Sequence, residues 1–358
     1  MWLSFITPIL KKSTLDKTDV NSYRPISNLS IISKLLERVV CSQLVCNLDA
    51  NSLMPCNQSA YRRHHWTEFA LTVVFGHNSG IGLRRCHATL ATWPVYSFRL
   101  RRPRHTLAHL RQSYGFDSFV YDWLSSYLRE RSQHVCSGGK STAPKTIKYG
   151  VPQGSVLGPL LFVLYTADIG RIIKLHGLSS HFYADDTQTY IFSKPDNVDI
   201  LCEATVSCID EVAMWMCANR LRLSQSKTEF VWCMTRRRLQ LPDNSSIQLG
   251  TNASVRNLGV FIDQSLTMTS HINIVTGRCF RSLRQIRTIC HLLVLDAART
   301  LVNSLVMSWT DYCNCILAGL SAHSIARLQS VLNVGSRVIH QRRKYHITDV
   351  LRENCTGC

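Results

Sequence analysis

The spacing of hydrophobic residues predicts a chain of mixed helices and strands. Apolar residues recur every three or four positions from Ile31 to about Leu48 and from Val198 to Ala218, as in a helix that packs one face on a core. Leu160–Ile169 is almost wholly apolar and is expected to be a buried helix. The same patterns predict helices over 119–128 and from His271 to about Arg352, and strands over 133–136, 146–149 and 255–263 and near 221–231.

Two neighbouring acids stand at the centre of the clearest strand pattern. In His181–Phe192, aromatic and β-branched residues flank Asp185 and Asp186, which predicts a strand, a tight turn and a second strand. Two carboxylates at a hairpin tip repel each other unless a cation neutralises them, and Mg²⁺ prefers carboxylate oxygens. For a pair of acids taken alone, a solvated turn is the alternative. The choice therefore depends on the rest of the chain.

Two further segments carry candidate chemistry. A loop rich in glycine, Gly150–Pro159, comes directly before the predicted buried helix. Upstream, Gln58–Glu68 combines basic and aromatic residues, and its Arg62 and Arg63 either bind phosphate or remain solvated surface charges. Both segments are compatible with recognition of a phosphate-bearing ligand.

Residues 77–112 follow neither the helical nor the strand period. No Asp or Glu occurs from Phe69 through Phe116, and Arg99–His105 is typical of a basic tail. We therefore expect this region to be irregular rather than part of a packed domain.

Charge and cysteine content narrow the class of partner. Lys and Arg outnumber Asp and Glu by 41 to 23 in 358 residues, a net charge of +18, which favours nucleic acid. Fifteen scattered cysteines favour a reduced intracellular setting, nuclear or cytoplasmic, and Cys355–Cys358 is expected to be a disordered tail rather than a zinc or redox site. The apolar segment Met1–Leu10 has no basic residues before it, and Pro8 and the lysines from Lys11 cut it short. Neither a signal peptide, a transmembrane segment nor a membrane partner is therefore expected.

Six segments, taken in order, resemble the sequence blocks of reverse transcriptases from non-LTR retrotransposons, the LINE elements of jockey and CR1 type. They are Ser22–Ser27, Gln58–Glu68, Tyr149–Pro159, Phe182–Asp186, Leu223–Thr228 and Leu258–Asp263. The resemblance implies an RNA-directed DNA polymerase, a nucleotidyltransferase. Its fold would be α+β, a right-hand polymerase with fingers, a palm containing an antiparallel sheet, and a helical thumb.

The resemblance also implies domain limits and partners. Residues 1–112 would form the fingers and a damaged first part of the palm, 113–265 the palm, 266–352 a helical thumb-like region and 353–358 a tail. An RNA template, a DNA primer and a dNTP would be the ligands. No protein partner is indicated.

Each matching block carries an implied role. Asp185 and Asp186 would hold Mg²⁺ in a two-metal site for phosphoryl transfer. Lys227 would lie near the departing pyrophosphate, with a surface lysine as the alternative. The remaining implied contacts to template or nucleotide are Arg24, Arg62, Arg63, Gln153 and Gly154.

One expected motif is missing. The family carries a third metal-binding aspartate on a palm strand, which by position falls near residues 92–105, where this chain has no carboxylate. We therefore expect a metal site with one ligand missing, a palm without one central strand, and a catalytically defective product. Rescue by Asp168, Asp196 or Asp199 is disfavoured because none is expected on that strand.

The genetic code offers an explanation for this gap. Back-translation of Cys86–His105, read one base later, permits a segment containing Ser-Thr-Ala-Phe-Asp-Ser-Val-Asp-His, which is close to the missing motif. At the aspartate position itself the codon of Trp93 and the first base of Pro94 would give glycine. The hypothesis is a frameshifted translation of a decayed element. The alternative function is a non-catalytic basic nucleic-acid-binding remnant, and a group II intron protein is disfavoured by the fingers blocks.

Overall fold

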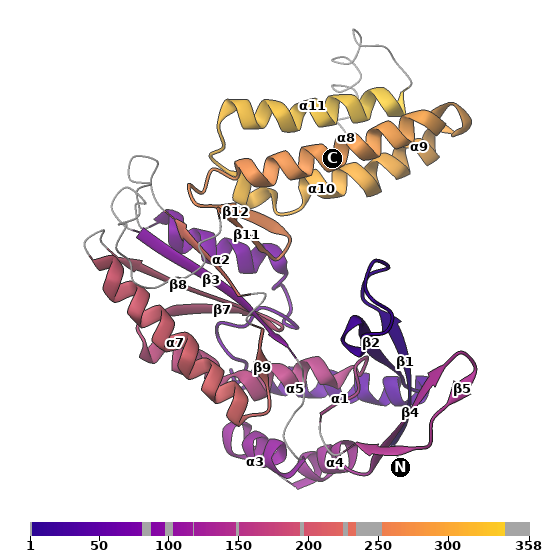
Figure 1. Ribbon diagram of the computed structural model, residues 1–358, viewed down its shortest axis with the longest axis vertical. Helices are drawn as coiled ribbons and strands as arrows, with labels where there is room; N and C mark the ends of the chain where they lie inside the picture. The colour runs from indigo at the N-terminus through magenta and orange to yellow at the C-terminus, as the bar shows by residue number, and fades with distance from the viewer. Residues whose placement is uncertain are drawn as a thin grey trace. The chain divides into compact units, whose positions relative to one another are not determined.

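The chain divides into two compact units, which are described separately. The computed structural model describes residues 2–80, 87–96, 103–116, 118–147, 150–193, 197–224, 228–233 and 253–340. Unit 1 comprises Met1–Trp66, Ala91–Ile191 and Asn197–Thr228, and unit 2 comprises Thr67–Leu90, Phe192–Asp196 and Glu229–Cys358. Figure 1 shows the elements of both units.

Unit 1 holds most of the strands and a cluster of helices. Its elements are β1 (Trp2–Leu10), β2 (Tyr23–Asn28), α1 (Ile31–Ala50), α3 (Pro103–Tyr114), α4 (Ser118–Leu128), β4 (Arg131–Ser137), β5 (Lys140–Ser141), β6 (Lys145–Ile147), α5 (Leu157–Thr166), α6 (Asp168–Leu175), β7 (Ser179–Tyr183), β8 (Asp186–Ser193), α7 (Val198–Ala218) and β9 (Arg222–Leu223). β3 (His87–Tyr96) and the last residues of β8 cross the division. One sheet has the order β2-β1-β4-β5, with β1 antiparallel to β2 and parallel to β4, and β6 pairs with β4.

The helices α1, α3, α4 and α5 form the main core of unit 1. Leu48, Leu107, Leu124 and Leu161 are buried in it and come from four different helices. Every residue of Leu157–Thr166 except Pro159 is buried, which confirms a buried helix here, although it begins three residues before the predicted Leu160 and ends at Thr166 instead of Ile169. The predicted helices over 31–48, 119–128 and 198–218 are confirmed as α1, α4 and α7.

The second sheet contains the β7–β8 hairpin and β3. β8 lies between β7 and β3, and β9 pairs with β3 through Val95 and Tyr96. In Figure 1 the ribbon of α7 runs beside these strands, and α7 contacts β9. The expected loss of a central strand is therefore wrong, because β3 supplies that strand.

The expectation of an irregular segment over 77–112 is also wrong where the chain is described. This region contains β3 and α3, and Leu107 and Leu110 of α3 are each only 1% exposed. The many basic residues of the region obscured a short apolar stripe. This stripe consists of Leu107 and Leu110, which pack α3 on the core. The expected loss of packed structure does not hold for these elements.

Unit 2 is mainly helical. Its elements are α2 (Thr67–Gly80), β10 (Glu229–Cys233), β11 (Ser254–Asn257), β12 (Val260–Asp263), α8 (Thr269–Ile289), α9 (Leu295–Val302), a π-helical turn (Asn303–Met307), α10 (Ser308–Asp311) and α11 (Ala322–Ile339). The single strand predicted over 255–263 is instead the hairpin β11–β12, because Leu258 and Gly259 both adopt positive φ and reverse the chain.

The C-terminal helices of unit 2 pack around an apolar core. α8 and α11 run side by side (Figure 1) and contribute Val275, Leu283 and Val331 to this core, with Val302 from α9. These contacts confirm the helical stripes predicted from His271 onward, as far as residue 340. Among the described residues, no helix is both long and apolar enough to cross a membrane.

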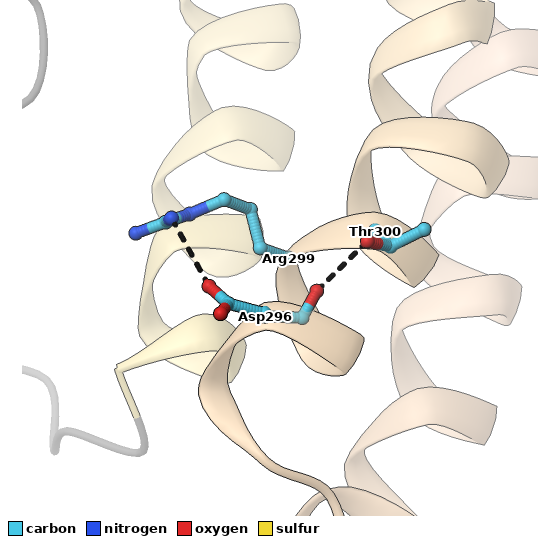
Figure 2. Close-up of polar contacts among 3 residues, drawn as sticks. All are labelled: Asp296, Arg299 and Thr300. Carbon is cyan, nitrogen blue, oxygen red and sulfur yellow. Dashed lines mark hydrogen bonds and ion pairs between the residues drawn. The ribbon is translucent and has the colours of Figure 1, made fainter.

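The first turn of α9 is held by local polar contacts (Figure 2). Arg299 donates to the Asp296 carboxylate at 3.4 Å, and the Thr300 hydroxyl donates to the Asp296 carbonyl oxygen at 2.8 Å. A carboxylate in a first helical turn also interacts favourably with the helix dipole. These residues therefore support the helix end, and an exposed pair of this kind contributes less than about 1 kcal/mol.

Candidate functional site

The two acids lie at the tip of the β7–β8 hairpin, as predicted. Tyr183 pairs with Asp186, so Ala184 and Asp185 form the turn and Asp186 opens β8. Asp185 is exposed and Asp186 is half-buried. Ala184 has φ 57°, a left-handed conformation that costs a residue other than glycine about 1–2 kcal/mol, so other contacts must hold the turn.

The two carboxylates are electrostatically unfavourable neighbours. Burial, followed by the negative charge of Asp185, raises the pKa of Asp186 from 3.8 to about 6. An unbalanced pair of this kind suits a divalent cation, and Mg²⁺ is commonly held by one or two carboxylates plus waters and substrate phosphates. The described residues contain no group of three or more His, Cys, Asp or Glu side chains placed to hold a metal ion. Asp185 and Asp186 are thus the pair of carboxylates at this turn that could hold one Mg²⁺ ion.

A residue that the sequence patterns missed supports the turn. Gln58 is 4% exposed, and its side-chain oxygen accepts from the backbone N–H of Ala184 at 3.1 Å and of Ala60 at 2.9 Å. The backbone beside it bonds to β7, because Ser59 N–H donates to the Phe182 carbonyl at 3.0 Å. Gln58 opens the basic and aromatic block, but an uncharged amide without a periodic pattern gave no signal of this role.

The predicted arginines of this block lie close to the turn or along α1. Arg62 is half-buried and donates to the Gln58 carbonyl at 3.5 Å. Burial, followed by the negative charge of Asp185, raises the pKa of the Tyr61 hydroxyl. Arg63 is exposed and lines a groove of about 460 Å³ together with Arg38. The structure thus joins Arg62 to the backbone of Gln58, which supports the turn, and places Arg63 beside Arg38.

The glycine-rich loop is joined to β2, which lies in the segment predicted as fingers. Gln153 and Gly154 are exposed, and the Gln153 carbonyl accepts from Ser27 N–H at 2.8 Å. Gly154 has φ 105°, and a Cβ there would lie 3.1 Å from the Ser27 carbonyl oxygen. Contacts within the protein therefore already require this glycine. Arg24 is exposed on β2, the strand that carries Ser27.

β3 occupies the position where the third acid was expected. Residue 93, assigned to that acid by the shifted reading, belongs to β3, which lies next to β8 in the sheet. The sequence of β3, His87–Tyr96, contains neither Asp nor Glu. Lys227, the other predicted catalytic residue, and the Cys355–Cys358 tail lie outside the described residues.

Unit 2 carries a basic stripe that was not singled out from the sequence. Arg278, Arg281, Arg284 and Arg287 recur every three positions along α8, and the last three are exposed. Arg278 lies over the ring of Trp309 at 4.9 Å. Successive members of this row lie about 60° apart around the helix, so the exposed Arg281, Arg284 and Arg287 form a band of cations that winds across the surface of α8. The spacing was visible in the sequence, but the exposure of the row was not.

Comparison with known proteins gives consistent matches. The family model described as reverse transcriptase (RNA-dependent DNA polymerase) matches residues 9–262. The probable RNA-directed DNA polymerase from transposon BS of Drosophila melanogaster is 27% identical over 282 residues, covering 74% of this chain and 30% of that protein. The RNA-directed DNA polymerase from mobile element jockey of the same species is 26% identical over 289 residues, covering 76% of this chain and 30% of the relative. The chain thus matches less than a third of the length of these relatives.

Solved structures share the fold. Telomerase from Candida albicans, solved with a fragment of telomeric RNA, superposes with a TM-score of 0.52 at 11% identity, covering 99% of this chain and 66% of that one. Apo telomerase from Candida tropicalis gives a TM-score of 0.51 at 12% identity, covering 95% and 58%. At this identity the likeness concerns the fold, and it confirms the predicted right-hand polymerase architecture.

Proposed function

Because the chain belongs to the reverse transcriptase (RNA-dependent DNA polymerase) family, we propose that it is the polymerase domain of a non-LTR retrotransposon protein and that it has lost catalytic activity. One observation carries the second part. The strand β8, which Asp186 opens, lies next to β3, whose sequence offers no carboxylate. The relatives named above act as RNA-directed DNA polymerases of mobile elements, which supports the first part.

The residues at the turn support binding of Mg²⁺, which reverse transcriptases generally use. Asp185 and Asp186 would hold the ion, and bound Mg²⁺ supplies positive charge that stabilises phosphate oxygens during phosphoryl transfer. Gln58 keeps the turn in place, and Arg62 donates a hydrogen bond to the Gln58 backbone. Without a third carboxylate, the two-metal arrangement of the family lacks a ligand, and this loss accounts for the proposed defect.

The basic surfaces support an RNA template, a DNA primer and a dNTP as ligands. Arg24 and Arg63 are exposed cations of unit 1, and α8 presents its arginine row in unit 2. Gln153, at the exposed crown of the glycine-rich loop, would contact the template or the nucleotide, and Gly154 lets the backbone pass close. Lys227 remains the proposed cation near the departing pyrophosphate.

The second candidate function is a non-catalytic nucleic-acid-binding protein, favoured by the net charge of +18. A paired experiment separates active polymerase, inactive polymerase domain and non-binder. Purified chain would be tested for primer extension on an RNA template and for binding to the same template–primer across salt concentrations. We expect steep weakening of binding with salt and no incorporation. Incorporation above background would contradict the proposed defect, and absence of binding would contradict the nucleic-acid role.

A further inference from the structure

A buried carboxylate lies beneath the glycine-rich loop. Glu37 of α1 is 0% exposed. Its Oε2 atom accepts three hydrogen bonds, from Ser155 Oγ at 2.8 Å, Val156 N–H at 2.7 Å and Leu157 N–H at 3.2 Å. These donors lie at the junction between the loop and α5. Glu37 therefore holds the end of the loop through the unpaired amides that begin α5.

Ser155 extends these bonds to α4. The Tyr127 hydroxyl lies 2.6 Å from Ser155 Oγ, which also accepts from Gly158 N–H at 2.9 Å. Burial, followed by the charge of Glu37, raises the pKa of Tyr127 to about 12. Tyr127 therefore stays protonated and donates to Ser155, whose own hydrogen goes to Glu37. All three groups are satisfied by one consistent set of bonds.

Arg131 holds the opposite end of the loop. This residue is 3% exposed, its guanidinium lies over the Tyr127 ring at 5.1 Å, and Nη2 donates to the Gly150 carbonyl at 2.7 Å. Its Nε and Nη1 atoms are buried without a hydrogen-bond partner among the described residues. Burial lowers the pKa of Arg131, while Tyr127 and Glu37 oppose that shift. Burying a carboxylate and a guanidinium is costly, and such groups can serve to specify one conformation rather than to add stability.

The loop is thus fixed at three points. Arg131 bonds to its first residue, Ser27 to Gln153 in its middle, and Glu37 to its end. Between these points, Gln153 and Gly154 face solvent. Because both ends of the loop are held by buried charge-assisted hydrogen bonds, its exposed middle, Gln153 and Gly154, has little freedom to move.

We infer that Glu37, Tyr127 and Arg131 are positioning residues, which act through the Gly150–Leu157 backbone to hold Gln153 in place for the template or nucleotide. This inference rests on the proposed function for the role of Gln153. A helix cap with a purely structural role would stabilise α5 without affecting what Gln153 does. Amide hydrogen exchange and a double-mutant cycle together distinguish a positioning role from a purely structural one.

Amide hydrogen exchange of the full chain tests the framework itself. Glu37→Gln retains the shape of the side chain and one acceptor oxygen but removes the negative charge, which weakens the three hydrogen bonds that converge on Oε2. We expect amide exchange at Val156 and Leu157 to become at least about tenfold faster, while exchange in parts of unit 1 that do not contact the loop stays unchanged. The matched control is Glu203→Gln, which alters an exposed glutamate of α7. Unchanged loop exchange in Glu37→Gln would overturn the inference. If that variant does not fold, Tyr127→Phe removes one hydroxyl and leaves the ring, and the same comparison applies.

A double-mutant cycle tests the link to Gln153. Affinity for an RNA template–DNA primer would be measured for Glu37→Gln, Gln153→Ala and the double variant. If Glu37 acts through Gln153, each single change weakens binding by about three- to tenfold and the double variant is no weaker than the worse single one. Additive losses would overturn the inference. If the unmodified chain binds no template–primer, the proposed function fails as well, and faster loop exchange in Glu37→Gln would then identify Glu37 as a helix cap only.

Discussion

Asp185 and Asp186 are adjacent in sequence but differ in environment. Asp185 stands exposed in the turn, whereas Asp186 is the half-buried first residue of β8. Burial, followed by the negative charge of Asp185, raises the pKa of Asp186 to about 6. This asymmetry makes Asp186 the residue through which the cost of the acidic turn can be measured.

The first prediction concerns the stability of the metal-free chain with Asp186→Asn. In the folded state Asp186 ionises near pH 6, above its ordinary value of 3.8, so ionisation destabilises the fold above pH 6 and not below about pH 4. We expect the variant to be more stable by on the order of 1 kcal/mol at pH 7.5, a figure reduced for partial exposure, and to lose this gain by pH 4. Urea unfolding in the presence of a chelator measures this difference in the free energy of unfolding. The control is Asp49→Asn, which alters an exposed carboxylate. An equal gain at both pH values would contradict the account.

Gln58 gives a second prediction at this scale. Gln58→Ala removes the acceptor for two backbone N–H groups, one of them at the left-handed Ala184. An unsatisfied buried donor costs about 1–3 kcal/mol, so the free energy of unfolding should fall by that amount and exchange at Ala184 should accelerate. Exposed Gln43→Ala on α1 is the matched control and should change stability by less than about 0.5 kcal/mol. Equal stability of the two variants would show that Gln58 does not support the turn.

Individual site residues were predictable where a local pattern marks them. The acids between two strand-like segments and the glycines before an apolar run led directly to the hairpin and the loop. Gln58 and Glu37 could not be found in this way, because their roles depend on partners more than a hundred residues away. A glutamate within a helical apolar stripe is indistinguishable in sequence from one on a solvated face.

Elements with strong periodicity were predicted well, and basic elements were not. α7 coincides with the predicted Val198–Ala218, and every residue of α5 except Pro159 is buried. α3 was missed because its apolar residues are few and lie among arginines, and β3 because no alternation marks it. The hairpin β11–β12 was predicted as one strand because leucine is not a typical turn residue. The chain nevertheless reverses at Leu258 and Gly259, which both have positive φ.

The third prediction concerns α8 as an element that binds phosphate. Replacing Arg281, Arg284 and Arg287 with Gln removes three exposed cations without disturbing the buried face of the helix. If the row contacts a nucleic-acid backbone, the slope of log affinity against log salt for a template–primer duplex should fall by about 2–3, since each phosphate contact contributes about 0.9.

A variant with the same loss of charge elsewhere is the control for α8. Arg129, Arg171 and Lys174, exposed in unit 1, would be replaced with Gln together. Fluorescence anisotropy between about 50 and 200 mM salt compares the two triple variants. Equal slopes would indicate that total charge, rather than the α8 row, determines binding.

At the scale of the whole molecule, the predicted resemblance to jockey-type reverse transcriptases is confirmed by the family match and by the mobile-element relatives. A single block would not identify the family, but six blocks in the same order along the chain were enough to predict it. The limits assigned to fingers, palm and thumb remain predictions. The division into two units crosses β3, the strand on which the proposed defect depends.

The central claim is that a polymerase fold is present and that β3 lacks the carboxylate needed beside the Asp185–Asp186 turn. Mg²⁺-dependent primer extension on an RNA template tests this claim most directly. The present chain would be compared with one whose 86–104 segment has the shifted-frame sequence, with aspartate in place of the glycine that this reading gives at position 93. We predict no incorporation by the present chain, and incorporation by the restored chain that Asp185→Ala abolishes. Incorporation by the present chain that is lost on Asp185→Ala would contradict the account.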